Sequence, residues 1–422
     1  LEPISMYHYL SFLTTPAPLT MFKNIYKLPA GHVLTIDSHG TISIDNYWDS
    51  VPSKGIDNSQ ITNLGDEEVE KFYVTGVRER LKKSIAKRMM SDVKMGIFLS
   101  GGIDSTMNVS MMKKISTKKL NTFTVGFKDY THLNEIEYAR QIAKEYNTNH
   151  HEILISKDDM VRYLDDLIYT QDEPIADWVC IPLYFVSKIA KEQGIKVVQV
   201  GEGSDEQFCG YAGYIQYLEM YYKYWIPFKK YFPRVIQVMI AKFANYITKY
   251  KKSYRSYADI IDRASRNREP FWSGCSVFWE NMKSDILNLN TDWECNLGKE
   301  IKKSKLVPKS YLQTDTYNII ASFLNNFDKK YPNRDLLTRM TYNEFKLRLP
   351  ELLLMRVDKI TMSNSIEARV PFLDHDLVDF TMDIPEKWKI KNKKSKYILK
   401  KALKGIIPDK IINRKKMGFG AP

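Results

Sequence analysis

The sequence has few cysteines and no long apolar run, and both absences narrow the class of protein. Its 422 residues include four cysteines, Cys180, Cys209, Cys275 and Cys295, without a Cys-x-x-Cys pair. This pattern argues against a cysteine-based metal site or redox pair and favours reduced, buried thiols, as is usual in the cytoplasm. No apolar run approaches the roughly 20 residues of a membrane span. We therefore expect a cytoplasmic protein without a membrane partner, in which the apolar residues 235–247 form a core helix.

Positive charge is spread along the chain and is not gathered in one long run. The formal net charge is +13, from 63 Lys and Arg against 50 Asp and Glu. A basic chain can bind an anionic partner such as a nucleic acid. Because the basic residues are dispersed, we interpret them as a solvated, Lys-rich surface and expect no nucleic-acid partner.

A glycine-rich turn lies between an expected strand and an expected helix. The turn is Ser100-Gly101-Gly102-Ile103-Asp104-Ser105, after the apolar residues 95–99 and before a helical pattern at 106–113. It lacks the Gly-Lys-Ser/Thr ending of a Walker A loop and the Gly-x-Gly-x-x-Gly spacing of a dinucleotide-binding loop. An ordinary tight turn is the alternative, but the flanking strand and helix favour an anion-binding loop.

The residue types of this turn suit a phosphate group. Its backbone N–H groups and the macrodipole of the following helix favour negative charge. Gly101 and Gly102 can take positive φ and let the backbone approach a phosphate closely. Ser100 and Ser105 add hydroxyl donors, and Asp104 can help to hold a magnesium ion.

Alternating strands and helices surround this turn. The expected strands cover residues 93–99, 120–126, 151–155 and 195–200. After about residue 207 we expect helices and no further clear strand. This alternation predicts an α/β fold, a doubly wound parallel sheet with a helical C-terminal part. Ligands bind at the carboxyl ends of such strands, so the loops after Leu99, Val125 and Val200 should meet at one edge.

A second cluster of polar residues follows the last expected strand. It reads Gly201-Glu202-Gly203-Ser204-Asp205-Glu206. Its three carboxylates can simply complement the macrodipole of the next helix. In the catalytic interpretation, Asp104 and Asp205 share the magnesium ion of a departing pyrophosphate. Glu202 is then available to orient or deprotonate an attacking amine.

A third cluster mixes charged and apolar residues at 356–359 and 365–374. Pro371 ends any helix before it, because the residue ahead of a proline avoids the α region. A helix end held by pairing of Glu367 with Arg369 and a binding role both fit this pattern. Periodicity does not decide between them.

Five segments, in their order along the chain, resemble the synthetase domain of the glutamine-hydrolysing asparagine synthetases: residues 100–105, 124–127, 201–206, 365–374 and 394–399. The resemblance implies the fold of the adenine-nucleotide α-hydrolase, or pyrophosphate-loop ATP pyrophosphatase, type. It also implies a two-step reaction. Aspartate and ATP first give β-aspartyl-AMP and pyrophosphate, and ammonia then displaces AMP to form asparagine.

The resemblance assigns roles by matching positions, and it implies ATP as a substrate and Mg²⁺ as a cofactor. The catalytic positions match Glu202, Lys396 and Asp104, with Lys396 steadying the transition state. The metal positions match Asp104 and Asp205. The positions that bind ATP or pyrophosphate match Leu99, Ser100, Gly101, Gly102, Asp104, Ser105, Val125, Val200 and Gly201.

The N-terminal part departs from the family pattern. The family has an N-terminal-nucleophile glutaminase domain that begins with a cysteine, whereas residue 1 here is Leu and the first cysteine is Cys180. Residues 1–50, with a β-hairpin predicted at 33–44, match only the end of that domain. We expect residues 1–50 to be its remnant, 51–65 a linker, and 66–422 a synthetase domain truncated at its C-terminus. The chain is then expected to use free ammonia, in a possible homodimer.

Three alternatives stay open at this stage. Close relatives amidate other carboxylates, including sugar acids, peptides and β-lactam precursors, and the residues do not fix the acceptor. A tRNA-modifying enzyme with the same loop would suit the basic charge, but it usually brings a catalytic cysteine pair or an RNA-binding module, and neither is visible. A non-catalytic protein that kept the fold is the third.

Overall fold

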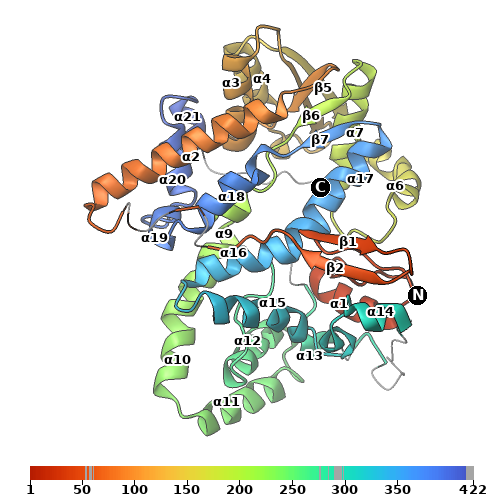
Figure 1. Ribbon diagram of the computed structural model, residues 1–422, viewed down its shortest axis with the longest axis vertical. Coiled ribbons are helices and arrows are strands. Elements are labelled where there is room, and N and C mark those ends of the chain that lie inside the picture. The colour runs from red at the N-terminus through yellow and green to blue at the C-terminus, as the bar shows by residue number, and fades with distance from the viewer. Residues whose placement is uncertain are drawn as a thin grey trace. The chain divides into compact units, whose positions relative to one another are not determined.

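The structure is a computed structural model that describes residues 1–52, 55–56, 59, 61–274, 277–283, 285–288, 297 and 299–414 (Figure 1). Cys275, Cys295 and part of the expected linker lie outside the described residues. The chain divides into two compact units. The helical unit comprises Leu1–Val51 and Tyr211–Leu352, and the sheet unit comprises Pro52–Gly210 and Leu353–Pro422.

The sheet unit is built on five parallel strands in the order β5-β4-β3-β6-β7. The strands are β3 (Met95–Phe98), β4 (Asn121–Phe127), β5 (Asn149–Ile155), β6 (Val197–Gln199) and β7 (Glu367–Arg369). The four predicted strands and the parallel α/β fold are confirmed. The expectation of no strand after residue 207 is wrong, because β7 pairs with β6. Its three residues carry two charges, so no apolar pattern marks it.

Two hydrophobic cores pack against the sheet. Ile97 belongs to one core, whereas Phe98, the next residue of β3, packs against the other. Successive side chains of a strand point to opposite faces, so helices cover both faces. The first core contains residues of α2 (Asp66–Arg88), α3 (Ile103–Ile115), α4 (Ile136–Glu145), α18 (His375–Met382) and α20 (Tyr397–Leu403). The second contains residues of α7 (Cys180–Glu192) and α17 (Met355–Ser363).

Short helices complete the sheet unit. They are η2 (Thr131–Leu133), α5 (Lys157–Arg162), α6 (Leu164–Thr170), α8 (Ser204–Phe208), η7 (Pro371–Leu373), α19 (Glu386–Lys389) and α21 (Asp409–Ile412). Cys180 and Cys209 are buried, unpaired thiols in this unit, as expected. Burial raises the pKa of both thiols to about 12, which keeps them protonated and unreactive.

The helical unit begins with α1 (Pro3–Phe12) and the predicted hairpin, which the structure confirms. Strands β1 (His32–Ile36) and β2 (Ile42–Asn46) pair antiparallel. The later elements are α9 (Ala212–Met220), η3 (Tyr221–Trp225), α10 (Ile226–Tyr231), α11 (Arg234–Ile247), η4 (Lys252–Tyr254), α12 (Arg255–Ser265), α13 (Glu280–Lys283), α14 (Lys299–Ser304), η5 (Lys309–Leu312), α15 (Tyr317–Lys330), α16 (Leu336–Lys346) and η6 (Leu349–Leu354).

The prediction of a core helix at residues 235–247 is half wrong. A helix forms there as α11, but it buries Gln237 and Ala241 and leaves Val235, Met239 and Phe243 exposed. The apolar character of the segment predicted burial, but it is the residues of the polar and small side that turn inward. Among the described residues, no helix has the length and apolar character needed to cross a bilayer.

Candidate active site

The site lies where the strand order of the sheet reverses. From β3 the chain moves outward to β4 and β5, and it then returns to place β6 on the other side of β3. In such sheets the loops after the two central strands leave in opposite directions and open a crevice between them. The glycine-rich turn follows β3, and the carboxylate cluster follows β6. The topology therefore brings both sequence motifs to one edge.

At Gly101 in the turn, any residue with a side chain would introduce strain. Its φ is +70°, and a Cβ there would lie 2.6 Å from the Tyr138 Cβ and 2.9 Å from the Ala139 nitrogen. Helix α4 thus packs directly against the turn. Gly102 is the N-cap of α3 with φ −78°, so the expected need for positive φ applies to Gly101 alone.

The two serines of the turn bond to the turn itself. The Ser100 N–H donates to the Ser105 Oγ at 3.2 Å, and the Gly102 N–H donates to the Ser100 Oγ at 3.3 Å. The two hydroxyls also lie 3.2 Å apart. These bonds hold the backbone in shape, so the hydroxyls position the loop as well as being available to a phosphate.

A buried lysine joins the two motifs. The Lys396 ammonium donates to both oxygens of Asp104, at 2.8 and 2.7 Å, and contacts the Asp205 carboxylate at 2.7 Å. It also donates to the Ser204 Oγ at 3.0 Å, and that hydroxyl donates to Asp104 at 2.6 Å. Gly210 leaves room for this cluster, because a Cβ there would lie 1.8 Å from the Asp205 Oδ1.

Lys396 is held as a cation by its neighbours. The residue is 3% exposed, at the start of α20, with a φ of +55° that is unusual for a side-chain-bearing residue. Its N–H donates to the Phe208 carbonyl at 3.0 Å. Burial alone would lower its pKa, but the Asp104 and Asp205 carboxylates outweigh burial and raise the pKa above the usual lysine range.

The oxygen donors of this cluster suit a magnesium ion. Asp104, Asp205 and Ser204 all turn oxygens toward one cationic group, the Lys396 ammonium. Carboxylate and hydroxyl oxygens are the ligand types that Mg²⁺ accepts. The two aspartates that the sequence indicated as metal ligands are therefore brought together. Whether they take that role stays a prediction.

Glu202 is oriented by an arginine to which sequence analysis gave no role. The Arg356 guanidinium donates to Glu202 at 2.8 Å through one nitrogen and to Asp177 at 2.5 Å through another. The Arg356 side chain is 7% exposed, whereas that of Glu202 is 27% exposed. Arg356 reaches the site from α17, so Glu202 is fixed in place while part of its carboxylate remains open to solvent.

The apolar residues that were predicted to contact ATP belong to the sheet and its edges. Leu99, Val125 and Val200 are buried in the two cores. Because Phe98 pairs with Phe123, Val125 lies level with Ser100, beyond the end of β3, although β4 runs on to Phe127. These residues therefore offer mainly backbone groups at the edge. The Val200 carbonyl accepts from the Asn108 side chain at 3.2 Å.

Gly201 also follows a strand, and a Cβ there would lie 2.9 Å from the Asp104 Cβ. A larger residue at this position would push Asp104 out of the cluster. Arg414, which the sequence showed only as part of a basic run, supports the turn from another side. It donates to the Gly101 carbonyl at 3.1 Å, pairs with Glu135 at 2.5 Å, and lies 3.7 Å from the Tyr138 ring centre.

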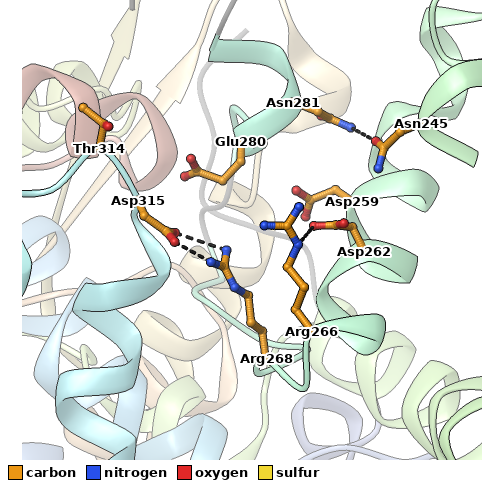
Figure 2. A pocket seen from close by; sticks show the side chains of 9 residues that line it. All are labelled: Asn245, Asp259, Asp262, Arg266, Arg268, Glu280, Asn281, Thr314 and Asp315. Carbon is orange, nitrogen blue, oxygen red and sulfur yellow. Dashed lines mark hydrogen bonds and ion pairs between the residues drawn. The ribbon is translucent and has the colours of Figure 1, made fainter. Parts of the chain in front are cut away.

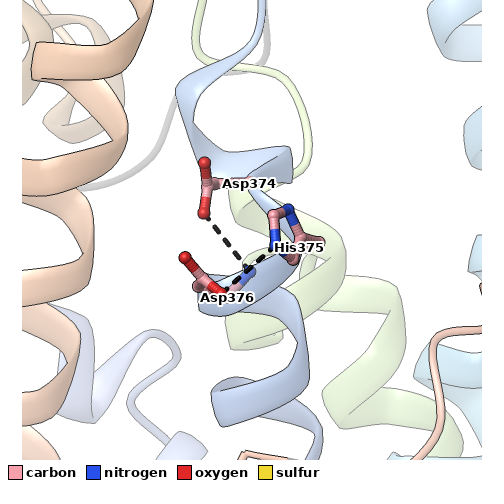
Figure 3. A group of neighbouring side chains, drawn as sticks. All are labelled: Asp374, His375 and Asp376. Atoms are coloured by element: carbon pink, nitrogen blue, oxygen red, sulfur yellow. Dashed lines mark hydrogen bonds and ion pairs between the residues drawn. The ribbon is translucent and has the colours of Figure 1, made fainter.

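Two other groups of polar side chains lie outside this cluster. Figure 3 shows Asp374, His375 and Asp376 at the start of α18, where their ligand atoms lie close enough to hold a metal ion. Asp374 accepts from the Asp376 N–H and pairs with Arg88 at 2.8 Å, and Asp376 pairs with Lys87 at 3.0 Å. This group caps a helix and has its charge balanced by cations.

The second group lines a cavity of about 350 Å³ in the helical unit (Figure 2). Arg268 pairs with Asp315, and Arg266 pairs with Asp262 at 2.8 Å. The opposite charges of the lining thus balance one another in pairs. The lining residues are Asn245, Asp259, Asp262, Arg266, Arg268, Glu280, Asn281, Thr314 and Asp315.

A parallel sheet with a Ser-Gly-Gly turn and paired aspartates at its reversal point defines an α/β protein with an anion-binding edge. Residues 76–422 match the asparagine synthase family, and the chain belongs to that family. The resemblance drawn from the five segments is thereby confirmed at the level of the family.

Two relatives and one solved structure show the range of similarity. An asparagine synthetase [glutamine-hydrolyzing] 1 of Bacillus subtilis is 30% identical, over 99% of this chain and 59% of that protein. The amidase chyE of Penicillium rubens is 25% identical, over 96% of this chain and 59% of that protein. A solved NMN synthetase of Francisella tularensis has a TM-score of 0.23 and 18% identity, over 34% of this chain and 58% of that chain. The chain thus spans about three fifths of the length of the curated relatives.

Proposed function

We propose that this chain carries out the ATP-dependent amidation of a carboxylate, with aspartate as the carboxylate and asparagine as the product. The observation that supports it most is the set of oxygens from Asp104, Ser204 and Asp205 around the Lys396 ammonium, next to the glycine-rich turn. Transfer of a nucleotidyl group builds negative charge on phosphate oxygens. A water-poor edge with a fixed cation and backbone donors stabilises that charge.

In the first step, a side-chain carboxylate oxygen of aspartate attacks the α-phosphorus of ATP. The bond from this phosphorus to the oxygen bridging the β-phosphate breaks, and pyrophosphate leaves with the electron pair. The glycine-rich turn and the N-terminus of α3 bind the phosphates, and Lys396 stabilises the charge that develops on them. Magnesium, with Asp104 and Asp205 as its protein ligands, would neutralise charge on the leaving pyrophosphate.

In the second step, ammonia attacks the acyl carbon of β-aspartyl-AMP. The bond from this carbon to the AMP oxygen breaks, AMP leaves, and the nitrogen loses a proton. Glu202 combines partial exposure with a fixed orientation and does not contact Lys396, so we assign it the role of accepting that proton. Arg356 keeps the carboxylate turned toward the acyl carbon without contacting substrate.

Glutamine is the proposed source of the ammonia in the longer protein. The Bacillus relative is named as glutamine-hydrolyzing, and this chain spans 59% of its length. By the family resemblance, residues 1–50 are the end of a glutaminase domain, 51–65 a linker and 66–422 the synthetase part. The same resemblance implies a homodimer, and the dispersed basic residues argue against a nucleic-acid partner. Light scattering and gel-shift assays test these two expectations.

Aspartate-dependent release of pyrophosphate tests the proposal. The chain is incubated with magnesium, ATP and ammonia, with or without aspartate, and pyrophosphate and asparagine are both measured. Lys396→Met should lower both rates by at least about 100-fold, because it removes a cation that acts in the transition state. Lys387→Met is the matched control, because Lys387 is 63% exposed and pairs with Asp66. Equal rates in the two variants would contradict the assignment.

A different carboxylate is the second candidate, and one comparison favours it. The relative from Penicillium rubens is named as an amidase, and it matches 96% of this chain. The same assay with sugar acids or peptides in place of aspartate tests this alternative. Pyrophosphate release with one of these acceptors and none with aspartate would keep the chemistry and change the substrate.

A further inference from the structure

Helix α11 turns its large apolar side chains outward. Val235, Met239, Phe243 and Tyr246 follow one another at steps of three or four residues, so they form one stripe along the helix, and Tyr250 continues their spacing in the turn after it. Their exposed fractions are 73, 64, 64, 53 and 74%. We call these five residues the α11 stripe. A run of this length is unlike the single exposed apolar residues that are common on protein surfaces.

The side of α11 that faces the protein carries a polar and a small residue. This side is buried, so the stripe faces solvent. Gln237 and Ala241 are 7 and 2% exposed. The Gln237 amide donates to the Phe232 carbonyl at 2.7 Å. Gln237 lies about 200° around the helix from Val235, on the opposite side. Figure 1 shows α12 running beside α11, and α10 leading into it. The helix is therefore held with its apolar side away from its own neighbours.

The C-terminal end of the stripe consists of tyrosines and has a lysine beside it. The hydroxyls of Tyr246 and Tyr250 lie 3.1 Å apart, and the Lys249 ammonium lies 5.8 Å from the Tyr246 ring centre. Tyr257, on α12, is 64% exposed. Tyrosine carries an apolar ring and a polar hydroxyl, and this combination is favoured where lipid tails meet water.

The charged residues of the segment that carries the stripe have one sign. Residues 221–258 contain seven lysines and two arginines and no aspartate or glutamate. Lys252 and Arg255 contact Asp285, from outside this segment, at 3.6 and 2.7 Å. Lys242 lies at an exposed position on α11, and Lys249 is exposed in the turn that follows it. An apolar stripe flanked by basic residues is the pattern of helices that lie in the plane of an anionic membrane surface.

We propose that the α11 stripe binds the surface of an anionic lipid bilayer, with α11 parallel to the membrane plane. The helix has 14 residues, so it is too short to cross a bilayer, and it would insert its side chains only to the depth of the headgroups. A second copy of the same face is disfavoured because it would bring like charges together. RNA is disfavoured because Val235 and Met239 have no ring on which a base can stack.

This inference departs from the expectation of no membrane partner and does not depend on the proposed chemistry. The full chain is mixed with vesicles of phosphatidylcholine alone, or of equal parts phosphatidylcholine and phosphatidylglycerol, and the bound fraction is measured by sedimentation. Binding is expected only to the vesicles that contain phosphatidylglycerol. Phe243→Ser should weaken it roughly ten-fold or more, because the ring no longer leaves water.

Matched variants separate the stripe from general attraction of a basic protein to anionic lipid. Tyr169→Ser removes a side chain that is 94% exposed on α6, and it should leave binding unchanged. Lys242→Gln with Lys249→Gln should weaken binding by about five-fold for each lysine. Circular dichroism checks that each variant is folded, which is expected because the replaced side chains are exposed.

Four results would overturn the proposal. One is the absence of binding to either vesicle at low salt. Another is equal binding of Phe243→Ser and the unmodified chain, which would show attraction by charge alone. A third is a change from dimer to monomer in Phe243→Ser, which would make the face a contact between copies. The fourth is loss of RNA binding in Phe243→Ser without any vesicle binding, which would make the partner a nucleic acid.

Discussion

Arg356 donates a hydrogen bond of 2.8 Å to Glu202, although the two residues are 154 positions apart in the sequence. The same guanidinium bonds to Asp177 at 2.5 Å. One buried cation thus balances two carboxylates and fixes the direction of the one that faces solvent. This relationship makes Arg356 a positioning residue in the proposed amidation, and it can be separated from a merely structural role.

Arg356→Met is expected to affect the second step of the reaction more than the first. Formation of asparagine should fall about 100-fold, because a catalytic group displaced by about 1 Å loses activity on this scale. Aspartate-dependent release of pyrophosphate should fall far less. Measuring both products on the same samples gives the ratio of the two steps. Arg140→Met, which removes an exposed ion pair with Glu152, is the control. An equal fall in both products would indicate only a structural role.

Gly101→Ala is expected to abolish ATP binding. Alanine at φ +70° is strained, and its Cβ would overlap with the backbone of α4 at Tyr138. Gly194→Ala separates these two effects, because Gly194 has a φ of +71° and no atom near a Cβ. Both variants should lose about 1 kcal/mol of unfolding free energy from backbone strain. Only Gly101→Ala should lose binding of ATP in titration calorimetry, and similar affinities in the two would contradict the packing argument.

The sheet was predictable from the sequence because its central strands are apolar and buried. Met95–Phe98 and Asn121–Phe127 stand out against their polar flanks. Strand β7 was missed because three residues, two of them charged, form a strand only through pairing with β6. Its place is set by tertiary contacts that no local pattern encodes.

The sequence predicted which motifs form the site, but it did not predict which side chains contact one another there. The carboxyl ends of β3 and β6 meet as the topology rule requires. The contacts of Arg356 with Glu202 and of Arg414 with Gly101 join residues 154 and 313 positions apart. Helical periodicity reports only on neighbours within a turn or two, so these contacts lie outside its reach. The exposure of the apolar side of α11 was not predicted for a related reason. Periodicity shows that a helix has an apolar face, but it does not show whether that face packs against the protein or faces solvent.

Gly210→Ala is expected to disrupt the cluster of Lys396 and Asp205. A Cβ at position 210 would lie 1.8 Å from the Asp205 Oδ1 and 2.5 Å from the Lys396 Cε, so one side chain must move. Release of pyrophosphate should fall at least about ten-fold, since the fixed cation leaves its place. Gly213→Ala serves as the control, because it has open space around a Cβ. Unchanged release in Gly210→Ala would mean that the cluster is not needed for the reaction.

His8 is expected to make the helical unit sensitive to acid. It is fully buried, its Nε2 lies 2.8 Å from the Tyr311 carbonyl, and its Nδ1 lies 3.1 Å from the Thr316 hydroxyl. Burial, opposed by the bond to Tyr311 and aided by Lys283, lowers its pKa to about 4. As the pH falls, His8 therefore takes up a proton near pH 6.5 in the unfolded chain but only near pH 4 in the folded chain. The unfolding free energy is therefore at its full value above pH 6.5 and decreases as the pH falls from 6.5 toward 4.

The size of this loss is roughly 3 kcal/mol between pH 7 and pH 4. It is measured as the unfolding free energy in urea at several pH values, for the unmodified chain and for His8→Gln. Glutamine keeps polar atoms near the Tyr311 carbonyl and the Thr316 hydroxyl but does not titrate, so its curve should fall less steeply below pH 6.5. His32→Gln, at a partly exposed hairpin position, should follow the unmodified chain. Parallel curves for His8→Gln and the unmodified chain would show that His8 takes up its proton without unfolding the unit.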